Sequence, residues 1–389
     1  MREHFEKVLG ISNALDHEND LRAYSYDASG LQGKARIVLF PESDEHLRQI
    51  LTWANRTNIP VTLRGLGANP NGQAVPNNSI VVDMSKFDRI HTLNLKEGWV
   101  LVDVGVVLSD LQKFLKRHGR ELAINPTSSN VATIGGLLAM NQMDRRSHKN
   151  GRLKENVVDF EMLDGTGKQY LSGDKRFIGL EGVGAVITKA KIRIQEPPTT
   201  LTTDLLPFEQ KHELVAKIEE LEGNLNVLSL EYINPLMSEL LDFKKKHHLL
   251  VEYSNEDGEI VNQEIQEKLW DMRDSAWSVA SKQGNTVIED VTVPTNYLYE
   301  FIEWCDERQL PLVGHAGRGI MHPFYKPDMD REELYEYVTM RGGSAAGQHG
   351  FGLLKKPYVK EHTKDLVIEL KDEYDYNDII GRGKLHDYA

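Results

Sequence analysis

Cysteine is nearly absent from this sequence of 389 residues, and its one example is Cys305. A single thiol forms no internal disulfide, and an iron–sulfur cluster needs several cysteine ligands. Any electron relay through such clusters would therefore lie on another polypeptide. Cys305 shares a predicted helix face with Leu298, Phe301 and Ile302, which favours a core residue over a nucleophile.

Long apolar runs are also missing. No stretch approaches the roughly 18 apolar residues that a membrane-spanning helix needs. Residues 1–10 carry charges throughout and have no apolar segment of signal-peptide length. We therefore expect no transmembrane segment and a cytoplasmic location.

Positive charge is the scarcer sign. The chain has 46 Lys and Arg residues against 59 Asp and Glu residues, which gives a net charge of −13. An acidic chain repels phosphate backbones, so nucleic acid is not an expected partner. A local basic pocket for an anionic small molecule stays open.

The remaining composition is that of a folded protein, with 40% hydrophobic and 27% charged residues. The length suits two domains, and the pair Pro197-Pro198, followed by several threonines, marks the main boundary. We predict a helical lead-in at 1–35, a first domain at 36–198, a second domain at 199–335 and a C-terminal segment at 336–389.

Strands and helices alternate in the first half. Ser43 is predicted to cap a helix whose first turn holds Asp44 and Glu45. Ser109 is predicted to cap a second helix, with Gly119 at its left-handed C-terminal cap. Short β-branched or apolar runs predict strands at 37–40, 60–63, 80–82, 99–104, 157–163 and 185–194.

The second half alternates in the same way. A helix over 208–221 is predicted to be opened by Pro207, and a long helix over 260–282 contains Trp270 and Arg273. Apolar runs predict strands at 227–232, 249–253 and 287–293, and amphipathic spacing predicts further helices at 296–308 and 360–371.

Three glycine-bearing loops are candidates for holding a long dinucleotide, because glycine lets backbone N–H groups approach a ligand closely. The first, from Arg64 to Gly72, follows a predicted strand, although it lacks the Gly-x-Gly-x-x-Gly spacing of a Rossmann fold. The second runs from Pro126 to Gly136, and the third from Gly179 to Thr188. The first loop taken alone is also compatible with a simple turn between strands.

The order and spacing of these loops resemble the FAD-binding domain of the vanillyl-alcohol oxidase superfamily, over residues 36–195. That family shows Arg-Gly-Gly-Gly-Thr after a strand, then Ala-Thr-Ile-Gly-Gly, then Gly-Ser-Glu-Gly-Thr-Leu-Gly-Ile-Ile-Thr. The resemblance implies FAD contacts at Arg64, Gly65, Leu66, Gly67, Ala68, Asn69 and Gly72, at Pro126, Ser128, Thr133, Gly135 and Gly136, and at Glu181, Gly182, Val186 and Ile187.

Two features of this region bear on how the flavin would be held. Some family members tie FAD covalently through a histidine in the first loop, where this chain has Ala68 and Asn69, so noncovalent FAD is implied. The family's Asn-Ala-Gly-Gly run is replaced by Asn141-Gln142-Met143-Asp144. Close backbone approach at that place is therefore not expected.

Histidine chemistry dominates the second half. His349 stands in a glycine-rich turn, where glycines on both sides indicate close approach of a ligand. His315 and His322 are candidates for a metal site if strands bring them together, and they are equally compatible with polar core residues. Arg273 offers a fork for a carboxylate, or an ion pair with Asp290 or another acid.

Residues from Val227 onward resemble the C-terminal domain of FAD-linked 2-hydroxy-acid oxidases of the glycolate oxidase and D-lactate dehydrogenase type. The shared words include Trp270-x-x-Arg273, Gly314-His315-Ala316-Gly317, Gly347-x-His349-Gly350 and Gly383-Lys384. The resemblance implies His349 as general base, Arg273 as carboxylate clamp, Lys384 at the cofactor, and His315 and His322 as metal ligands in members with a divalent ion.

Three positions depart from the family pattern. Gly317-Arg318-Gly319-Ile320 replaces Gly-Asp-Gly-Asn, Gln348 replaces a glutamate, and Gly381-Arg382-Gly383-Lys384 replaces Asn-Pro-Gly-Lys. A neutral amide binds a divalent cation less well than a carboxylate, so the sequence favours a site without metal. We hypothesise that Arg318 takes over part of the metal's role toward the substrate.

The predicted fold is α+β, with a two-subdomain FAD-binding domain, an antiparallel-sheet cap domain over 199–335, and a C-terminal segment that returns to the FAD domain. The predicted activity is oxidation of a small 2-hydroxy acid to the 2-keto acid by hydride transfer to FAD. An electron-acceptor subunit, quinone or cytochrome is a candidate partner. The alternative is a catalytically silent FAD-binding subunit of a larger oxidase; an oxidase of sugar lactones or alcohols is disfavoured by the C-terminal motifs.

Overall fold

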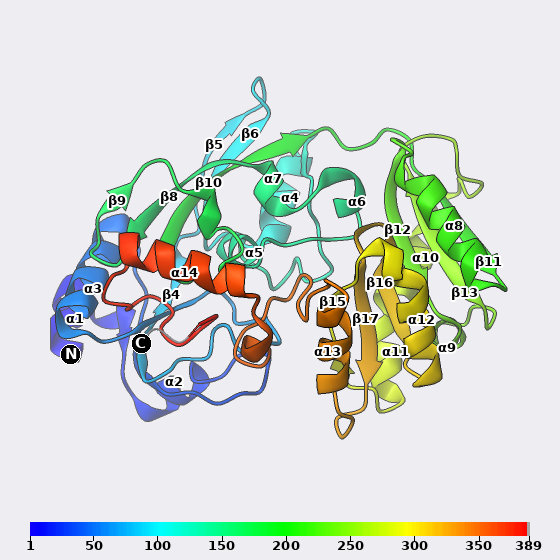
Figure 1. The fold of residues 1–389 in the computed structure, drawn as a ribbon. Helices are drawn as coiled ribbons and strands as arrows, with labels where there is room; N and C mark the ends of the chain where they lie inside the picture. Colours follow the sequence, from blue (N-terminus) through cyan, green and yellow to red (C-terminus); the bar gives the residue numbers. More distant parts are fainter. Residues whose placement is uncertain (387–389) are drawn as a thin grey trace. The chain divides into compact units, whose positions relative to one another are not determined.

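The chain forms two compact units in the computed structural model, which describes residues 1–386 (Figure 1). Unit 1 contains Met1–Gln142, Arg152–Glu196 and the C-terminal residues from His349, whereas unit 2 contains Met143–Gly151 and Pro197–Gln348. The division at Pro197 coincides with the double proline of the sequence.

The other predicted divisions need correction. The predicted boundary at 336 falls inside helix α13 (Glu332–Met340), whose Leu334 and Val338 are buried in unit 2. Because a packed helix cannot be divided between two cores, the return to unit 1 begins only at His349. The lead-in 1–35 is part of unit 1, since its two-residue strand β1 extends the first sheet.

Unit 1 is built from many short elements. In chain order its helices and strands are α1 (Arg2–Leu9), β1 (Ala14–Leu15), α2 (Glu18–Ala23), β2 (Ala35–Leu39), α3 (Asp44–Thr57), β3 (Val61–Arg64), β4 (Ser79–Asp83), β5 (Ile90–Asn94), β6 (Trp99–Asp103), α4 (Leu108–Lys116), β7 (Glu121–Leu122), α5 (Ile134–Met140), α7 (Leu153–Asn156), β8 (Val157–Asp164), β9 (Gln169–Tyr170), β10 (Ala185–Gln195) and α14 (Glu361–Tyr374), with 3-10 turns at Ile11–Asn13, Met84–Lys86, Lys175–Phe177 and Lys356–Tyr358.

The first sheet of unit 1 has the strand order β1-β2-β4-β3. Strands β2, β4 and β3 run parallel, and β1 pairs antiparallel with β2. Helix α3 begins where predicted, because Ser43 Oγ accepts the His46 N–H at 3.2 Å. It ends at Asn58 in the left-handed conformation and buries Leu47, Ile50 and Leu51.

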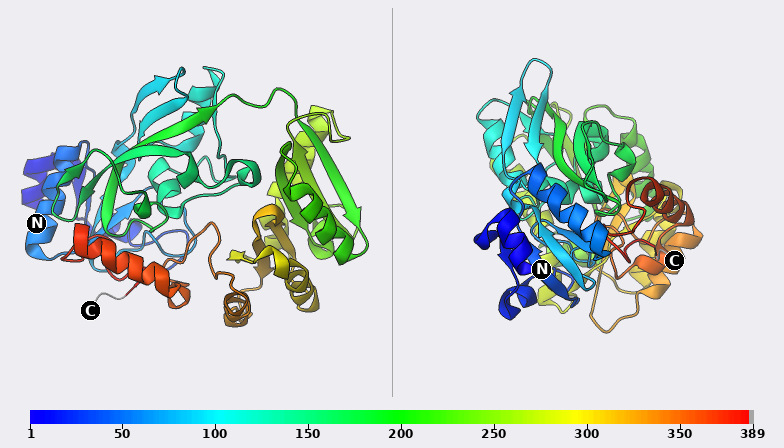
Figure 2. Two further views of the ribbon diagram at one scale, coloured as in Figure 1. Left: turned by 45° about the horizontal axis from the view of Figure 1, so that its top comes forward. Right: turned by 90° about the vertical axis from the view of Figure 1, so that its left-hand side faces the viewer.

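The second sheet of unit 1 is antiparallel and has the order β5-β6-β10-β8-β9, with β7 paired to β10. Strand β10 alternates buried and partly exposed residues along most of its length, as expected for a sheet covered on one face. Strands β5 and β6 form a hairpin at the edge of this sheet, drawn in cyan (Figure 2). The two sheets give unit 1 the predicted two-subdomain architecture.

The C-terminal helix α14 belongs to unit 1 although it follows unit 2 in the sequence. Figure 1 draws it in orange-red among the blue and green elements of that unit. Its Val367 and Leu370 join the same apolar core as Ile80 and Val186. The part of the chain from His349 onward therefore belongs to unit 1.

Unit 2 contains a seven-stranded antiparallel sheet in the order β11-β13-β12-β16-β17-β14, with β15 paired to β17. Its elements, besides α13, are α6 (Ser147–Asn150), β11 (Thr202–Phe208), α8 (Lys211–Glu222), β12 (Val227–Ile233), α9 (Pro235–Leu240), β13 (His247–Tyr253), α10 (Gln263–Asp274), α11 (Ala276–Lys282), β14 (Val287–Ile288), β15 (Val291–Thr292), α12 (Leu298–Glu307), β16 (Leu312–His315) and β17 (Ile320–Tyr325), with 3-10 turns at Thr295–Tyr297 and Ala316–Arg318. This is the predicted antiparallel-sheet domain.

Four element predictions were wrong in detail. Pro207 does not open a helix but lies in β11, an edge strand where the missing N–H is tolerated. The helix predicted over 260–282 begins at Gln263 and divides at Ser275 into α10 and α11, and the strand predicted over 287–293 divides into β14 and β15. Ser109 lies inside α4, whose N-cap is Val107, so the hydroxyl does not cap that helix.

Candidate functional site

The first glycine loop leaves β3 at Arg64 and lies directly against the second loop. A Cβ on Gly65 would lie 2.5 Å from Thr133 Oγ1, so only glycine fits there. Gly67 and Gly72 have φ angles of 66° and 91°, which other residues rarely adopt. The Arg64 guanidinium donates to Tyr26 O at 2.7 Å, and Leu66 and Ala68 are exposed.

The second loop ends at the start of α5. Thr133 Oγ1 accepts the Gly136 N–H at 3.2 Å, and Gly135 donates its N–H to Val104 O at 2.7 Å. A Cβ on Gly135 would lie 3.0 Å from the Val104 Cβ, which explains the small residue. Earlier in this loop Pro126 is buried and Ser128 is exposed.

The third loop is tied to the C-terminal segment through Glu181. This residue is 6% exposed, and its carboxylate accepts the N–H groups of Phe351 at 2.7 Å and Gly352 at 2.8 Å. Burial raises the pKa of Glu181 above its usual value, although the hydrogen bonds from Phe351 and Gly352 act to lower it. Gly182 follows with a φ of 76°, and Val186 and Ile187 lie on β10 opposite Leu163 and Met162.

His349 begins the C-terminal part of unit 1, where its backbone carbonyl accepts the side-chain amides of Asn69 at 3.0 Å and Gln73 at 2.9 Å. The glycines around it have a structural reason. A Cβ on Gly350 would collide with Met140 and Glu181, and one on Gly352 with Asn71 O. The interpretation that these glycines indicate ligand approach is therefore corrected, because the protein's own loops fill that space.

Lys384 completes the polar set in unit 1. It is 4% exposed, and its ammonium donates to Gln73 O, directly after the first glycine loop. Burial lowers the pKa of Lys384 to about 8, although Glu181 and Asp27 act in the opposite direction. The sequence-predicted cofactor residues of all three loops are thus in unit 1, together with Lys384 and His349.

Unit 2 contains a buried cluster around Glu231, a residue that sequence reasoning missed. Glu231 Oε2 lies 2.5 Å from Arg273 Nη2, and its Oε1 lies 2.5 Å from His315 Nδ1. Burial alone would raise the pKa of Glu231, but attraction to Arg273 and His315 prevails and holds that pKa at about 2. An acid in the middle of a predicted strand was the available signal, since every residue of β12 is buried.

Arg273 is thus fixed in place without being saturated. Its side chain is 11% exposed, and its Nε is buried without a hydrogen-bond partner among residues 1–386. The acid that it contacts is Glu231, with Asp274 Oδ1 further away at 3.8 Å. The arginine therefore keeps donors for a further acceptor.

His322 lies beside His315, with ring centroids 5.6 Å apart. Its Nδ1 donates toward Glu289 O at 3.2 Å, and its Nε2 lies 3.3 Å from the side-chain nitrogen of Gln348. Asp290 does not bind Arg273; its carboxylate accepts the N–H groups of Gly347 at 2.8 Å and Gln348 at 3.1 Å. It therefore fixes the backbone directly before His349.

The donor set at these histidines does not fit a divalent ion of the kind that carboxylate ligands hold. No group of three or more His, Cys, Asp or Glu side chains able to ligate a metal occurs among residues 1–386. The carboxylates nearby face the Nδ1 atoms of the histidines, whereas the neighbour of the His322 Nε2 is the amide nitrogen of the neutral Gln348. We derive no chemical step through a metal.

Arg318 has partners that the sequence did not suggest. Its Nε donates to Ser147 O at 2.8 Å, and its Nη2 donates to His148 O at 3.0 Å. The guanidinium thereby holds the segment Met143–Gly151, which belongs to unit 2. Because these two hydrogen bonds use its Nε and Nη2, Arg318 has fewer donors left for a substrate.

Comparison with known proteins defines the class. A family model described as "FAD binding domain" matches residues 35–171, and one described as "FAD linked oxidases, C-terminal domain" matches residues 235–385. The chain therefore belongs to the FAD-linked oxidases, and it is an oxidoreductase with FAD as its cofactor. The resemblance stated from the sequence is confirmed at this level.

Curated relatives span most of the chain. Glycolate oxidase subunit GlcD of Bacillus subtilis is 24% identical over 99% of this chain and 96% of its own length. The mitochondrial D-lactate dehydrogenase (cytochrome) of Arabidopsis thaliana is 24% identical over 90% and 73%. D-lactate dehydrogenase of Archaeoglobus fulgidus is 25% identical over 90% and 91%.

Solved structures show the same fold. A structure of alkyldihydroxyacetonephosphate synthase superimposes with a TM-score of 0.68 at 15% identity, covering 95% of this chain and 83% of that chain. Within residues 1–386, none of the helices combines the length and the apolar character needed to cross a membrane.

Proposed function

We propose that this protein oxidises a small 2-hydroxy acid, of the D-lactate or glycolate type, to the corresponding 2-keto acid. The observation that carries the proposal is the buried Arg273, which Glu231 fixes while its Nε stays unpaired among the described residues. A fixed guanidinium with open donors suits a carboxylate. The names of the glycolate oxidase and D-lactate dehydrogenase relatives support the same substrate class.

Each group has a proposed part. Arg273 binds the substrate carboxylate, and the His349 imidazole takes the hydroxyl proton. Bound FAD supplies the acceptor for the hydride from the carbon. The three glycine loops and Lys384 hold that cofactor without a covalent bond. Arg318 takes a smaller part than the sequence suggested, since two of its donors bind Ser147 and His148 carbonyls.

The electrons then leave to a separate acceptor, for which a partner subunit, a quinone or a cytochrome is proposed. The relatives include a glycolate oxidase subunit and a D-lactate dehydrogenase (cytochrome), which supports this proposal. The rival role is a catalytically silent FAD-binding subunit. Gln348 in place of an acid favours that rival, because a neutral amide rather than a carboxylate then faces the Nε2 of His322.

The experiment is anaerobic mixing of the yellow protein with glycolate, D-lactate, L-lactate and D-2-hydroxyglutarate. We expect the flavin absorbance to bleach with at least one D-acid or glycolate. In Arg273→Met the concentration needed for half-maximal bleaching should rise by about 100-fold, since a charge-assisted hydrogen-bonded pair is lost. Arg308→Met is the matched control, because Arg308 also pairs with an acid in unit 2 but is 30% exposed.

Bound flavin that no hydroxy acid bleaches would favour the silent subunit. Bleaching that is equally sensitive in Arg273→Met and the parent protein would remove Arg273 from its proposed role. Absence of any bound or added FAD would contradict the cofactor assignment on which both roles depend.

A further inference from the structure

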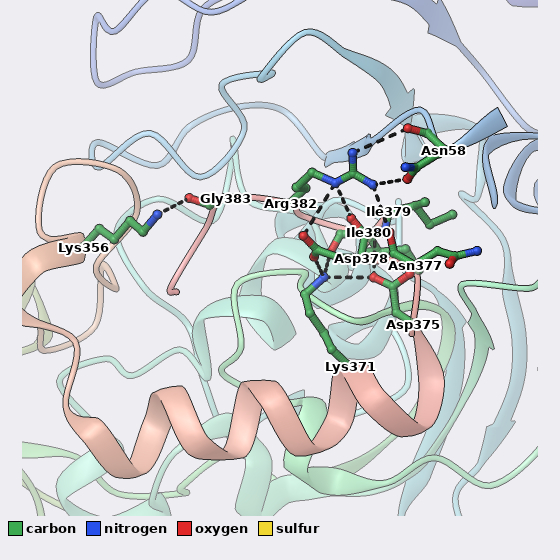
Figure 3. Close-up of polar contacts among 10 residues, drawn as sticks. All are labelled: Asn58, Lys356, Lys371, Asp375, Asn377, Asp378, Ile379, Ile380, Arg382 and Gly383. Atoms are coloured by element: carbon green, nitrogen blue, oxygen red, sulfur yellow. Dashed lines mark hydrogen bonds and ion pairs between the residues drawn. The ribbon is translucent and has the colours of Figure 1, made fainter. Parts of the chain in front are cut away.

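The last residues after α14 form a feature that we name the C-terminal clasp, residues 375–384. Its root is a buried charge cluster (Figure 3). Lys371, 1% exposed, contacts Asp375 Oδ2 at 2.9 Å, the Asp378 carboxylate, and Ile380 O at 3.0 Å. Buried charges are costly unless paired, so this cluster fixes where the clasp begins.

The Asp375 carboxylate also shapes the chain that follows it. It accepts the N–H groups of Ile379 at 3.0 Å and Ile380 at 2.8 Å, which folds the clasp back toward the first sheet. Arg382 closes the turn from the other side, donating to Asn58 Oδ1 at 2.5 Å and to Asn377 O at 2.9 Å (Figure 3).

The clasp forms hydrogen bonds at both ends of the first glycine loop. Val61, in the strand that enters the loop, donates to Ile379 O at 2.7 Å and accepts the Gly381 N–H at 3.0 Å. At the exit of the loop, Gln73 O accepts the Lys384 ammonium. The loop is thereby held at its entrance and its exit by one short segment.

The clasp also touches the third glycine loop. Gly184 donates its N–H to Ile380 O at 3.3 Å, and a Cβ on Gly381 would lie 3.0 Å from Val183 Cγ2 and 3.2 Å from Gly182 O. Gly381, with a φ of 70°, therefore lets the clasp pass close to this loop. Two cofactor loops far apart in the sequence share one brace.

We propose that the C-terminal clasp holds the first and third glycine loops in their FAD-binding arrangement, and that Lys371, Asp375 and Arg382 are positioning residues for the cofactor. None of these three residues belongs to a glycine loop. The inference goes beyond the proposed reaction and needs only that the chain binds FAD.

The test compares FAD affinity of full-length apoprotein variants by fluorescence titration. Asp375→Asn should weaken FAD binding by about tenfold or more, equivalent to about 1.4 kcal/mol. Arg382→Met, at the rim of the cluster, should weaken it by a smaller factor. The bound flavin's visible absorption band should also lose its resolved shoulder, because a loosened cradle admits water.

Arg176→Met is the matched control. Arg176 also binds α14, through Glu369, but it lies outside the clasp, and within residues 1–386 its side chain forms no hydrogen bond or ion pair with a glycine loop. Its FAD affinity should equal that of the parent protein. The melting temperature of each apoprotein separates a lost cofactor from a lost fold.

Native FAD affinity and an unchanged flavin spectrum in Asp375→Asn, together with a lowered apoprotein melting temperature, would show that the cluster only stabilises the fold and would overturn the proposal. Should Asp375→Asn fail to fold, Arg382→Met decides: native affinity and spectrum there overturn the proposal equally. An equal loss of affinity in Arg176→Met would also contradict it.

Discussion

Glu231 holds two groups at once, which makes it the most consequential single side chain of unit 2. It is fully buried, and it fixes both Arg273 on α10 and His315 on β16. Removing one member of a buried charged set leaves the others without compensation. Replacing Glu231 is therefore expected to lower the stability of the fold and to change the orientation of Arg273.

We predict that Glu231→Gln lowers the free energy of unfolding by about 3–5 kcal/mol at pH 7. The folded pKa of about 2 lies below the usual 4.5, so the carboxylate stabilises the fold above pH 4.5 and loses this contribution as pH falls through about 2. Urea unfolding should therefore show the parent and variant converging between these pH values. Glu239→Gln is the control, since Glu239 pairs with Lys245 at the surface. A difference independent of pH contradicts this account.

Gln348 offers a gain-of-function prediction at the same scale. Gln348→Glu places a carboxylate beside His322, whose Nδ1 already faces a backbone carbonyl. We expect Zn²⁺ affinity, measured by calorimetry and elemental analysis, to rise by about 10–100-fold, the size of effect that changes around metal ligands produce. Gln309→Glu adds the same charge at an exposed position and should change nothing. Stoichiometric metal in the parent protein would contradict the prediction.

At the scale of elements, the contact between the first glycine loop and the start of α5 is a steric one. Gly65→Ala should weaken FAD binding and lower the melting temperature, because its Cβ would lie 2.5 Å from Thr133 Oγ1. Thr133→Ala should cost about 1 kcal/mol through the lost helix cap. The double variant should be more stable than the sum of the single effects, since the colliding oxygen is gone.

Gly223→Ala is the control for this pair, because its Cβ would meet nothing within 4 Å. The melting temperature of Gly223→Ala should stay within a degree or two of the parent, as expected for surface substitutions. Strict additivity of Gly65→Ala and Thr133→Ala would show that the two loops do not depend on each other.

Elements with a local signal were predictable from the sequence, and those fixed by distant partners were not. The cap at Ser43 and the boundary at Pro197 follow from neighbouring residues. The prediction for Pro207 was wrong because a strand tolerates proline at the edge of a sheet, and the edge position of β11 is not visible in the sequence. Glu231 lies 42 positions from Arg273 and 84 from His315, so no local pattern reveals that they meet.

At the scale of the whole molecule, the chain passes between its units more often than the sequence suggested. It leaves unit 1 after Gln142 and returns at Arg152, before leaving again for the longer stretch that starts at Pro197. The family's Asn-Ala-Gly-Gly run is replaced at the point where the chain first leaves unit 1. The departure at Asn141-Gln142-Met143-Asp144 was visible in the sequence, but its consequence depended on partners in unit 2.

The segment Met143–Gly151 is bound to the rest of unit 2 through Arg146 and Glu252. This ion pair gives the prediction at the scale of the whole molecule. Arg146 binds Glu252 through two hydrogen bonds, Nε to Oε2 at 2.7 Å and Nη2 to Oε1 at 3.0 Å. Glu252 is 2% exposed, so Arg146→Met leaves a buried carboxylate unpaired and should cost about 3–5 kcal/mol. Calorimetry should show the transition of unit 2 shifted to lower temperature, while the temperature of flavin release, which reports unit 1, moves less.

Lys245→Met, which removes an exposed ion pair of the same unit, should leave both temperatures unchanged. Equal shifts of both transitions in Arg146→Met would mean that the segment Met143–Gly151 stabilises unit 1 as much as the unit that contains it.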